Sequence, residues 1–372
     1  MYLQKLSLLN FKNYSEAKVE FSEHINCLTG DNGSGKTNVL DAIYYLSMCR
    51  SYFTPTDTQN IKHGMPFFMI EGEFVSGKNT DTIYCGLKQG QKKVFKRNQK
   101  EYSRLNEHIG TFPVVMIAPV DHELITEGSE VRRSFLNRII SQMDKLYLDE
   151  LITYNKLLEQ RNALLKQMAS GTLPDAASVE VWDEQLAPLG EKIYKRRKIF
   201  IKEFEPVFKK IYRYMTGESE EPGMIYESQL DGNDFAALLK QAFQKDKIMQ
   251  FTTVGIHKDD LQFTINKYAA KKYGSQGQQK SLVVALKLAQ FELLKHHKNL
   301  KPVVMLDDLF DKLDDHRVNR ILKLVKDHAF GQLFITDTHP ERIKHILNDH
   351  EIPFSSFAIK DGMVQEELEI RN

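Results

Sequence analysis

The chain has 372 residues, of which 41% are hydrophobic and 27% are charged, with a formal net charge of +1. This is the composition of an ordinary soluble globular protein with two domains, or with one domain and a large insertion. No apolar run approaches the roughly 18 residues of a membrane span, and the N-terminus has no signal-peptide pattern, so we expect a cytoplasmic protein without a membrane partner. Cys27, Cys49 and Cys85 have no metal-type spacing, so we expect reduced thiols.

A glycine-rich loop at 30–37 is the first informative motif, because it has the spacing G-x-x-x-x-G-K-T of a P-loop. An apolar run at 25–29 predicts a buried strand before it, and apolar residues at helical spacing over 38–46 predict a helix after it. Backbone N–H groups of such a loop cradle phosphates, while Lys36 reaches the β- and γ-phosphates and Thr37 holds Mg²⁺. These flanks disfavour the alternative of a plain glycine-rich turn. The predicted nucleotide-binding residues are Gly30, Asp31, Asn32, Gly33, Ser34, Gly35, Lys36, Thr37 and Asn38.

The chain then changes character twice. Strands are predicted at 67–74, 82–87 and 114–118, followed by helical periodicity from about 130 to 216 with a break at 170–175. Beyond about 251 strands return at 301–306 and 332–336, with a helix between them at 318–325. We therefore predict an α/β nucleotide domain assembled from both ends of the chain (1–118 and 251–372), with an inserted helical arm domain at 119–250. The first helix of the arm should be roughly 35–40 Å long.

Two acidic residues, Asp307 and Asp308, follow the apolar run that ends at 306. Carboxylates at the carboxyl edge of a parallel sheet lie where ligands bind. Asp307 suits a hold on Mg²⁺, as in a Walker B strand, and Asp308 is predicted to be catalytic with Lys36, by orienting a water that attacks the γ-phosphate. The alternative is that both acids merely close a strand and cap the next helix.

A small polar turn precedes the amphipathic helix that begins near 276. Its residues Ser275, Gln276, Gly277 and Gln278 could bind an anion through free N–H groups, although a plain helix N-cap is the alternative. The order P-loop, S-x-G-Q, then four apolar residues and D-D resembles an ABC-type ATPase head. That resemblance implies an ATP-dependent homodimer, in which the serine–glycine turn of one copy acts in trans on the nucleotide of the other.

Patterns spread over nearly the full chain resemble the RecF family of bacterial recombination-repair ATPases, which are related to SMC proteins. The matching stretches are 9–14 with the P-loop and Asn38, 119–124 with Gly128 and 132–136, 154–162 with Leu164 and Leu165, and 255–261 with 275–280 and 306–308.

The resemblance implies a weak, DNA-stimulated ATPase that uses ATP and Mg²⁺ and works at the nucleoid. The family binds duplex DNA and single-strand/duplex junctions as an ATP-bound dimer, and acts with RecR and RecO to load RecA on gapped DNA. Asp314 keeps the acidic position of the dimer-facing D-loop, whereas Asp311 and Lys312 depart from the usual pattern. Asp337 stands where many ABC ATPases carry histidine, so the roles of Asp337 and His339 near the γ-phosphate stay open.

Two basic clusters are candidates for DNA contacts, which would be backbone-directed because no base-reading motif is present. Solvated helix faces are the alternative for both. A transporter ATPase subunit would share the head motifs, but it would not need the helical arm. The candidate DNA-binding residues are Lys92, Lys93, Lys96 and Arg97 in one cluster, and Lys195, Arg196 and Arg197 in the other.

Overall fold

The computed structural model describes residues 1–169, 176–217, 220–309, 318–321, 323 and 330–370. The chain divides into two compact units. We call the first the head unit (Met1–His122, Tyr214–Gly217 and Lys280–Asn372) and the second the arm unit (Glu123–Arg213 and Glu218–Gln279).

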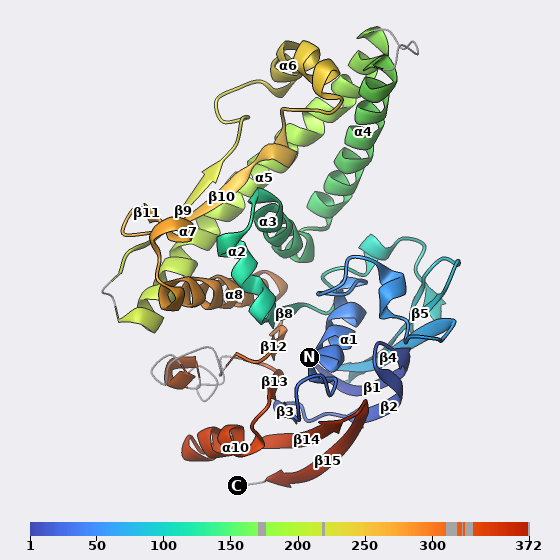
Figure 1. Cartoon of the computed structure of the whole chain (residues 1–372), viewed down its shortest axis with the longest axis vertical. Coiled ribbons are helices and arrows are strands. Elements are labelled where there is room, and N and C mark those ends of the chain that lie inside the picture. The colour runs from blue at the N-terminus through green and yellow to red at the C-terminus, as the bar shows by residue number, and fades with distance from the viewer. Residues whose placement is uncertain (170–175, 218–219, 310–317, 322, 324–329, 371–372) are drawn as a thin grey trace. The chain divides into compact units, whose positions relative to one another are not determined.

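A six-stranded, mainly parallel sheet in the head unit carries both the P-loop strand and the strand before Asp307 (Figure 1). All neighbouring strands pair in parallel except β15, which is antiparallel at the edge. Burial on both faces explains the continuous apolar runs in the sequence. β13 lies between the P-loop strand β3 and β12. Because all three strands are parallel, their carboxyl ends lie at the same edge of the sheet. The strands in spatial order are β15 (Met363–Ile370), β14 (Phe354–Lys360), β3 (Ile25–Thr29), β13 (Leu333–Asp337), β12 (Val303–Leu306) and β8 (Val114–Ile117).

A second, antiparallel sheet of the head unit packs on the other side of helix α1 (Lys36–Met48). This helix is apolar on nearly all sides and is buried because it contacts strands of both sheets. The strands in spatial order are β2 (Tyr14–Glu20), β1 (Tyr2–Phe11), β4 (Phe67–Ser76), β5 (Asn79–Lys88), β6 (Val94–Arg97) and β7 (Lys100–Glu101).

The remaining helical elements of the head unit are short, apart from α8. Of the helix predicted at 318–325, residues 318–321 and 323 are helical and the others lie outside the described residues. The elements are α10 (Pro340–Asp349), α8 (Gln276–Lys298), which begins in the arm unit, and 3₁₀ turns at Asp57–Asn60, Leu105–Glu107 and Pro119–His122.

The arm unit consists of helices and a small antiparallel sheet of order β11-β10-β9. Its two long helices, α4 and α5, are antiparallel, because Glu150 pairs with Arg196 while Arg161 pairs with Asp183. This is the predicted helical hairpin; the predicted break at 170–175 lies outside the described residues. The elements are α2 (Glu123–Thr126), α3 (Ser129–Met143), α4 (Lys145–Ala169), α5 (Ala176–Thr216), β9 (Pro222–Glu227), α6 (Phe235–Met249), a 3₁₀ turn (Ile256–Lys258), β10 (Asp260–Ile265), β11 (Tyr268–Ala269) and α7 (Ala270–Tyr273).

The unit boundaries differ from the predicted domain limits at three places. Residues 119–122 and 214–217 group with the head unit. Residues 251–279 group with the arm unit and not with the C-terminal lobe of the head. The reason is strand pairing: β10 pairs along its whole length with β9, from Asp260 opposite Glu227 to Ile265 opposite Pro222. Among the described helices, none has both the length and the apolar character that crossing a bilayer requires.

Candidate nucleotide-binding site

The loop between β3 and α1 needs glycine at both of its ends. Gly30 has φ 149°, and a Cβ there would lie 2.2 Å from the carbonyl oxygen of Ile359 in β14. Gly35 has φ 120°, and its Cβ would lie 2.6 Å from the side-chain amide of Asn13. Both backbone conformations and both close approaches exclude a side chain. The loop is therefore pressed between β14 and the β1–β2 turn.

Lys36 is a buried cation that contacts only neutral oxygens in the described part of the chain. Its side chain folds back so that Nζ donates to the carbonyl oxygens of Gly30 at 2.7 Å and Asp31 at 3.0 Å. The residue is 4% exposed, and none of the described carboxylates lies within ion-pair distance. Burying an ammonium group without a counter-ion is costly, so this geometry favours an anion at the loop.

Thr37 links the P-loop to the strand that carries the acidic pair. Its hydroxyl donates to the carboxylate of Asp307, 2.9 Å from Oδ1 and 3.1 Å from Oδ2. Thr336, from the intervening strand β13, donates to the same Oδ1 at 2.8 Å. Burial raises the pKa of Asp307, and the two threonine hydrogen bonds oppose that rise. The structure thus brings together the two predicted Mg²⁺ ligands, which lie 270 positions apart in the sequence.

Asp308 follows directly, in a left-handed backbone conformation with φ 46°. Its N–H donates to the hydroxyl of Thr336 at 2.9 Å, so Thr336 contacts both acidic residues. Non-glycine residues in this region of the Ramachandran plot are uncommon and cluster at functional sites. The chain thus bends directly after β12, and the Asp307 carboxylate is bonded to Thr37.

Residues outside the loop also hold it, and sequence reasoning assigned them no role. Asn13 donates to the carbonyl oxygen of Ser34 at 2.9 Å and accepts from Asn38 at 2.8 Å. The Tyr14 hydroxyl donates to the carbonyl oxygen of Gly35 at 3.1 Å. Asn13 and Tyr14 belong to a stretch used for the family resemblance, but an Asn-Tyr pair in a turn carries no nucleotide signal of its own.

These residues fit a nucleotide and a hard divalent cation. Ser34 Oγ is buried and has no hydrogen-bond partner among the described residues. It lies inside the loop, close to Gly30: a Cβ added at Gly30 would be 3.0 Å from it. A phosphate oxygen would satisfy both this hydroxyl and the Lys36 ammonium. The Thr37 hydroxyl and the Asp307 carboxylate are oxygen ligands of the type that Mg²⁺ prefers.

The predicted signature turn belongs to the arm unit and forms a reciprocal helix cap. The N–H of Gln278 donates to Ser275 Oγ at 3.2 Å, and the N–H of Ser275 donates to Gln278 Oε1 at 2.8 Å. This is a capping box at the start of α8. Ser275 and Gln276 are exposed, while Gly277 and Gln278 are half-buried. The N-cap alternative therefore describes the local geometry, and Ser275 is exposed at a helix N-terminus.

The basic clusters are only partly available for DNA. The prediction for Arg197 is wrong: it is 1% exposed and donates to Asp259 Oδ2 at 2.6 Å and to the Ile256 carbonyl at 2.8 Å. Lys93 is engaged by Asp57 at 2.6 Å and Arg97 by Asp81 at 2.8 Å.

The other members of these clusters are more accessible. Arg196 pairs with Glu150 at 2.8 Å, and Lys195 lies 3.9 Å from Glu191 on the exposed face of α5. Lys92 is exposed and forms no ion pair with any described residue, and Lys96 lies over the ring of Tyr84.

At the end of β13, Asp337 is buried beside the P-loop strand, whereas His339 is exposed. Asp337 is buried, accepts the N–H of His339 at 2.7 Å and is held by the guanidinium of Arg342. It pairs in register with Thr29, the residue before the P-loop, whereas the His339 side chain is exposed. Asp314, the predicted D-loop residue, lies outside the described residues.

Known proteins match the chain over its full length. Residues 2–352 match the family model of the RecF/RecN/SMC N-terminal domain. A DNA replication and repair protein RecF from Flavobacterium johnsoniae is 49% identical over 359 residues, which cover 96% of this chain and 100% of the relative.

Solved structures agree with this relationship. The recombination mediator protein RecF in its ATP form, of the RecFOR pathway, has a TM-score of 0.89 at 31% identity and covers 99% of this chain and 98% of its own. The Smc head domain from Pyrococcus furiosus, at 16% identity and a TM-score of 0.57 over 99% of this chain and 96% of its own, shares the fold. The transporter alternative is not favoured. With its P-loop, acidic strand end and helical arm, the chain belongs to the RecF family of DNA replication and repair proteins, and it is an ATP-binding ATPase of the SMC-related type.

Proposed function

We propose that this chain is an ATP-dependent DNA-binding protein whose ATP-bound dimer holds duplex and single-strand/duplex junction DNA. In recombinational repair and at replication forks it would act with RecR and RecO to help load RecA on gapped DNA, at the nucleoid in the cytoplasm. Hydrolysis would be weak, stimulated by DNA, and would reset the dimer. The observation that carries the proposal is the buried Lys36, which has only carbonyl partners in the described chain and lies in the same loop as the Thr37–Asp307 link.

Each site residue has a distinct role in this proposal. Lys36 and the loop N–H groups bind the phosphates, and Thr37 with Asp307 would hold Mg²⁺, which neutralises phosphate charge when bound. Asp308 orients the attacking water, while Thr336 holds the Asp307 carboxylate and the backbone N–H of Asp308. The turn 275–278, in which Ser275 and Gln276 are exposed, would contact the nucleotide site of the second copy together with the D-loop residue Asp314, so ATP stabilises the closed dimer.

The dimer is tested by size-exclusion chromatography with light scattering. Asp308→Asn should give an ATP-bound dimer that persists, because the water is no longer oriented but the phosphates are still bound. Lys36→Ala should lose ATP binding and remain monomeric. A monomeric Asp308→Asn protein at saturating ATP would show that the dimer model is wrong.

Ser275 offers a sharper test, because its cap role and its trans role can be separated. Aspartate caps a helix as well as serine does, but its charge would repel a phosphate of the partner's nucleotide. Ser275→Asp should therefore fold and bind ATP but fail to dimerise, whereas the control Ser275→Thr should dimerise. Equal dimerisation of both variants would restrict Ser275 to the helix cap.

DNA binding is measured separately, on duplex, single-strand and gapped substrates over a salt series. ATP should strengthen retention of duplex and junction DNA by wild type and not by Lys36→Ala, and the salt slope should report the number of phosphates contacted. ATP-independent binding of equal strength in both proteins would contradict the switch.

A further inference from the structure

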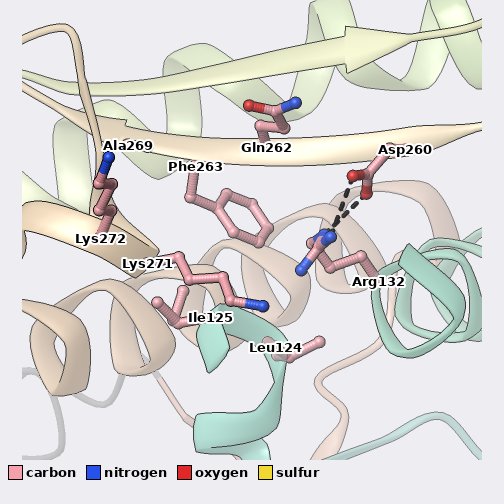
Figure 2. Close-up of a pocket in the computed structure, with 9 residues that line it drawn as sticks. All are labelled: Leu124, Ile125, Arg132, Asp260, Gln262, Phe263, Ala269, Lys271 and Lys272. Atoms are coloured by element: carbon pink, nitrogen blue, oxygen red, sulfur yellow. Dashed lines mark hydrogen bonds and ion pairs between the residues drawn. The ribbon is translucent and has the colours of Figure 1, made fainter. Parts of the chain in front are cut away.

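The arm unit contains a cavity that none of the nucleotide or dimer roles uses. Its volume is about 520 Å³, within the size range of small-ligand and side-chain binding pockets. It lies between α2, the start of α3, β10 and the β11–α7 segment (Figure 2). The residues that line it are Leu124, Ile125, Arg132, Asp260, Gln262, Phe263, Ala269, Lys271 and Lys272.

One side of the cavity is apolar. Leu124 and Ile125 from α2 and Phe263 from β10 contribute their side chains, and in Figure 2 the Phe263 ring extends from β10 towards the two α2 residues. These three side chains are at most 5% exposed. A surface of this kind favours an aliphatic or aromatic group, because burying it removes apolar area from water.

The charges at the cavity are unbalanced. Arg132 is neutralised, since its guanidinium forms a two-bond pair with Asp260 at 2.8 and 3.0 Å. Lys271 and Lys272 are exposed, and neither forms an ion pair with a described residue. The polar contact of Lys271 is a long one of 3.4 Å to the Glu127 carbonyl, and its side chain extends over the cavity towards Arg132 (Figure 2). Two ammonium groups at the edge of an apolar hollow favour an occupant with negative charge.

We propose that this cavity, which we call the lysine cavity, docks a short segment of a partner protein that carries one apolar anchor side chain between acidic residues. The anchor packs on Leu124, Ile125 and Phe263, and the flanking carboxylates pair with Lys271 and Lys272. Charge complementarity of this kind gives specificity and a salt-dependent association rate. A nucleic-acid base is a poorer fit, because Leu124 and Ile125 offer no hydrogen-bond partners for the polar edges of a base beside Phe263.

The position of the cavity connects it to the turn at 274–278. Lys271 and Lys272 belong to α7, and the N–H of Gly274 donates to the Ala270 carbonyl at 3.0 Å. The Gln279 side chain donates to the carbonyls of Ala270 and Gly274 at 3.0 and 3.1 Å. The wall of the lysine cavity and the start of α8 are therefore joined by hydrogen bonds, so a docked segment would contact α7, the element that leads directly into the turn with Ser275.

The test is fluorescence anisotropy with the full chain and four labelled peptides. Each has two acidic residues on either side of a single anchor, which is Leu, Ile, Phe or Trp, and a matched set carries lysines in place of the acids. At least one acidic peptide should bind, and its lysine counterpart should not. If none of the four acidic peptides binds wild type, the proposal is wrong.

Three variants locate the binding. Lys271→Glu with Lys272→Glu should weaken the peptide at least about tenfold, and Ala269→Phe should abolish binding by filling the cavity without changing charge. The matched control is Lys267→Glu, an exposed lysine outside the lining, which should bind as wild type does. If Lys267→Glu weakens peptide binding as much as the cavity variants do, the binding is non-specific charge attraction and the proposal is wrong. If the cavity variants lose binding of a labelled duplex DNA but still bind the peptide, the cavity binds nucleic acid and the proposal is also wrong. All variants are checked for wild-type circular dichroism.

Discussion

Buried cations in this protein differ in what surrounds them. Arg132, Arg161, Arg197 and Lys287 each contact a carboxylate, at distances between 2.5 and 2.8 Å. Lys36 is as buried as these, yet in the described chain its ammonium contacts carbonyl oxygens. Because an unpaired buried charge is destabilising, a cation without a carboxylate is retained where a ligand supplies the missing charge. The contrast supports the proposal that Lys36 binds a ligand, whereas the other four cations have structural partners within the chain.

His108 is a buried residue of the head unit whose surroundings predict a loss of stability in acid. It is fully buried, and its Nε2–H donates to the carbonyl oxygen of Leu46 in α1 at 2.7 Å, while Nδ1 accepts from Tyr102 at 3.1 Å. Burial lowers the pKa of His108 to about 4 from an ordinary value of 6.5. The imidazole is therefore neutral in the folded protein at pH values where it would already be protonated in the unfolded chain.

This difference predicts a loss of stability as the pH falls. Below pH 6.5 the unfolded state binds more protons than the folded state, so the free energy of unfolding decreases until the folded pKa is reached. Between pH 8 and pH 5, wild type should lose about 2 kcal/mol more than His108→Gln, whose amide can still donate to Leu46. Urea denaturation followed by circular dichroism measures the difference. Parallel losses in the two proteins would mean that His108 does not cause the sensitivity.

At the scale of elements, the P-loop depends on β14 as much as on its own strand and helix. β14 is the parallel neighbour of β3, and Gly30 lies against its Ile359 carbonyl. A Cβ at Gly33, in contrast, meets nothing within 4 Å, although φ is 80°. One loop thus contains a glycine required by a close backbone approach and another required by conformation alone.

These two glycines should respond differently to alanine. Gly33→Ala should reduce the free energy of unfolding by about 1 kcal/mol, the cost of a left-handed conformation. Gly30→Ala should cost at least about 3 kcal/mol, because either β14 or the loop must move. Urea titrations without nucleotide give both values. Equal costs would mean that the contact with Ile359 is relaxed at no expense.

Local patterns in the sequence predicted the elements that carry the nucleotide motifs. β3, α1, β12 and β13 are apolar runs or periodic segments beside glycine or acidic signals, so pattern and motif agree. β14 was not predicted, because its buried residues Ser355 and Ser356 interrupt the apolar run of a strand that lies between β15 and β3 in the sheet.

Contacts distant in sequence explain what was missed or wrong in the site. Asn13 reaches the P-loop, and Thr336 reaches the acidic pair, only because the sheets bring distant strands together. Arg197 was taken for a surface residue because its partners Asn137 and Asp259 lie about 60 positions away on either side, as the separations of 60 and 62 show. A basic run on a helix carries no sign of such partners.

At the scale of the whole molecule, a single side chain joins distant parts of the head unit. Gln332, fully buried before β13, accepts the N–H of Leu3 at 2.7 Å and donates to the carbonyls of Leu3 and Ser22, both at 2.8 Å. These bonds connect the antiparallel sheet with the parallel sheet across more than 300 positions.

Removing this amide should take these hydrogen bonds from the buried N–H and carbonyl of Leu3, whereas the Ser22 carbonyl keeps its bond from the Asn26 side chain. Gln332→Ala is expected to lower the free energy of unfolding by about 3 kcal/mol, since each unsatisfied buried group costs about 1–3 kcal/mol. The exposed Gln91→Ala is the control and should change stability by less than about 0.5 kcal/mol. Thermal unfolding by circular dichroism compares them, and similar melting temperatures would show that water replaces the Gln332 amide.

The same long-range pairing determines when the P-loop can form during synthesis. β3 leaves the ribosome early, but its two neighbours in the sheet are β13 and β14, which begin at Leu333 and Phe354. The arm unit is almost continuous in the chain and is finished first. A ribosome-bound chain therefore completes its arm while its P-loop strand still lacks both neighbours. We therefore expect tight nucleotide binding only from a nearly finished molecule, and not from chains shortened by premature termination.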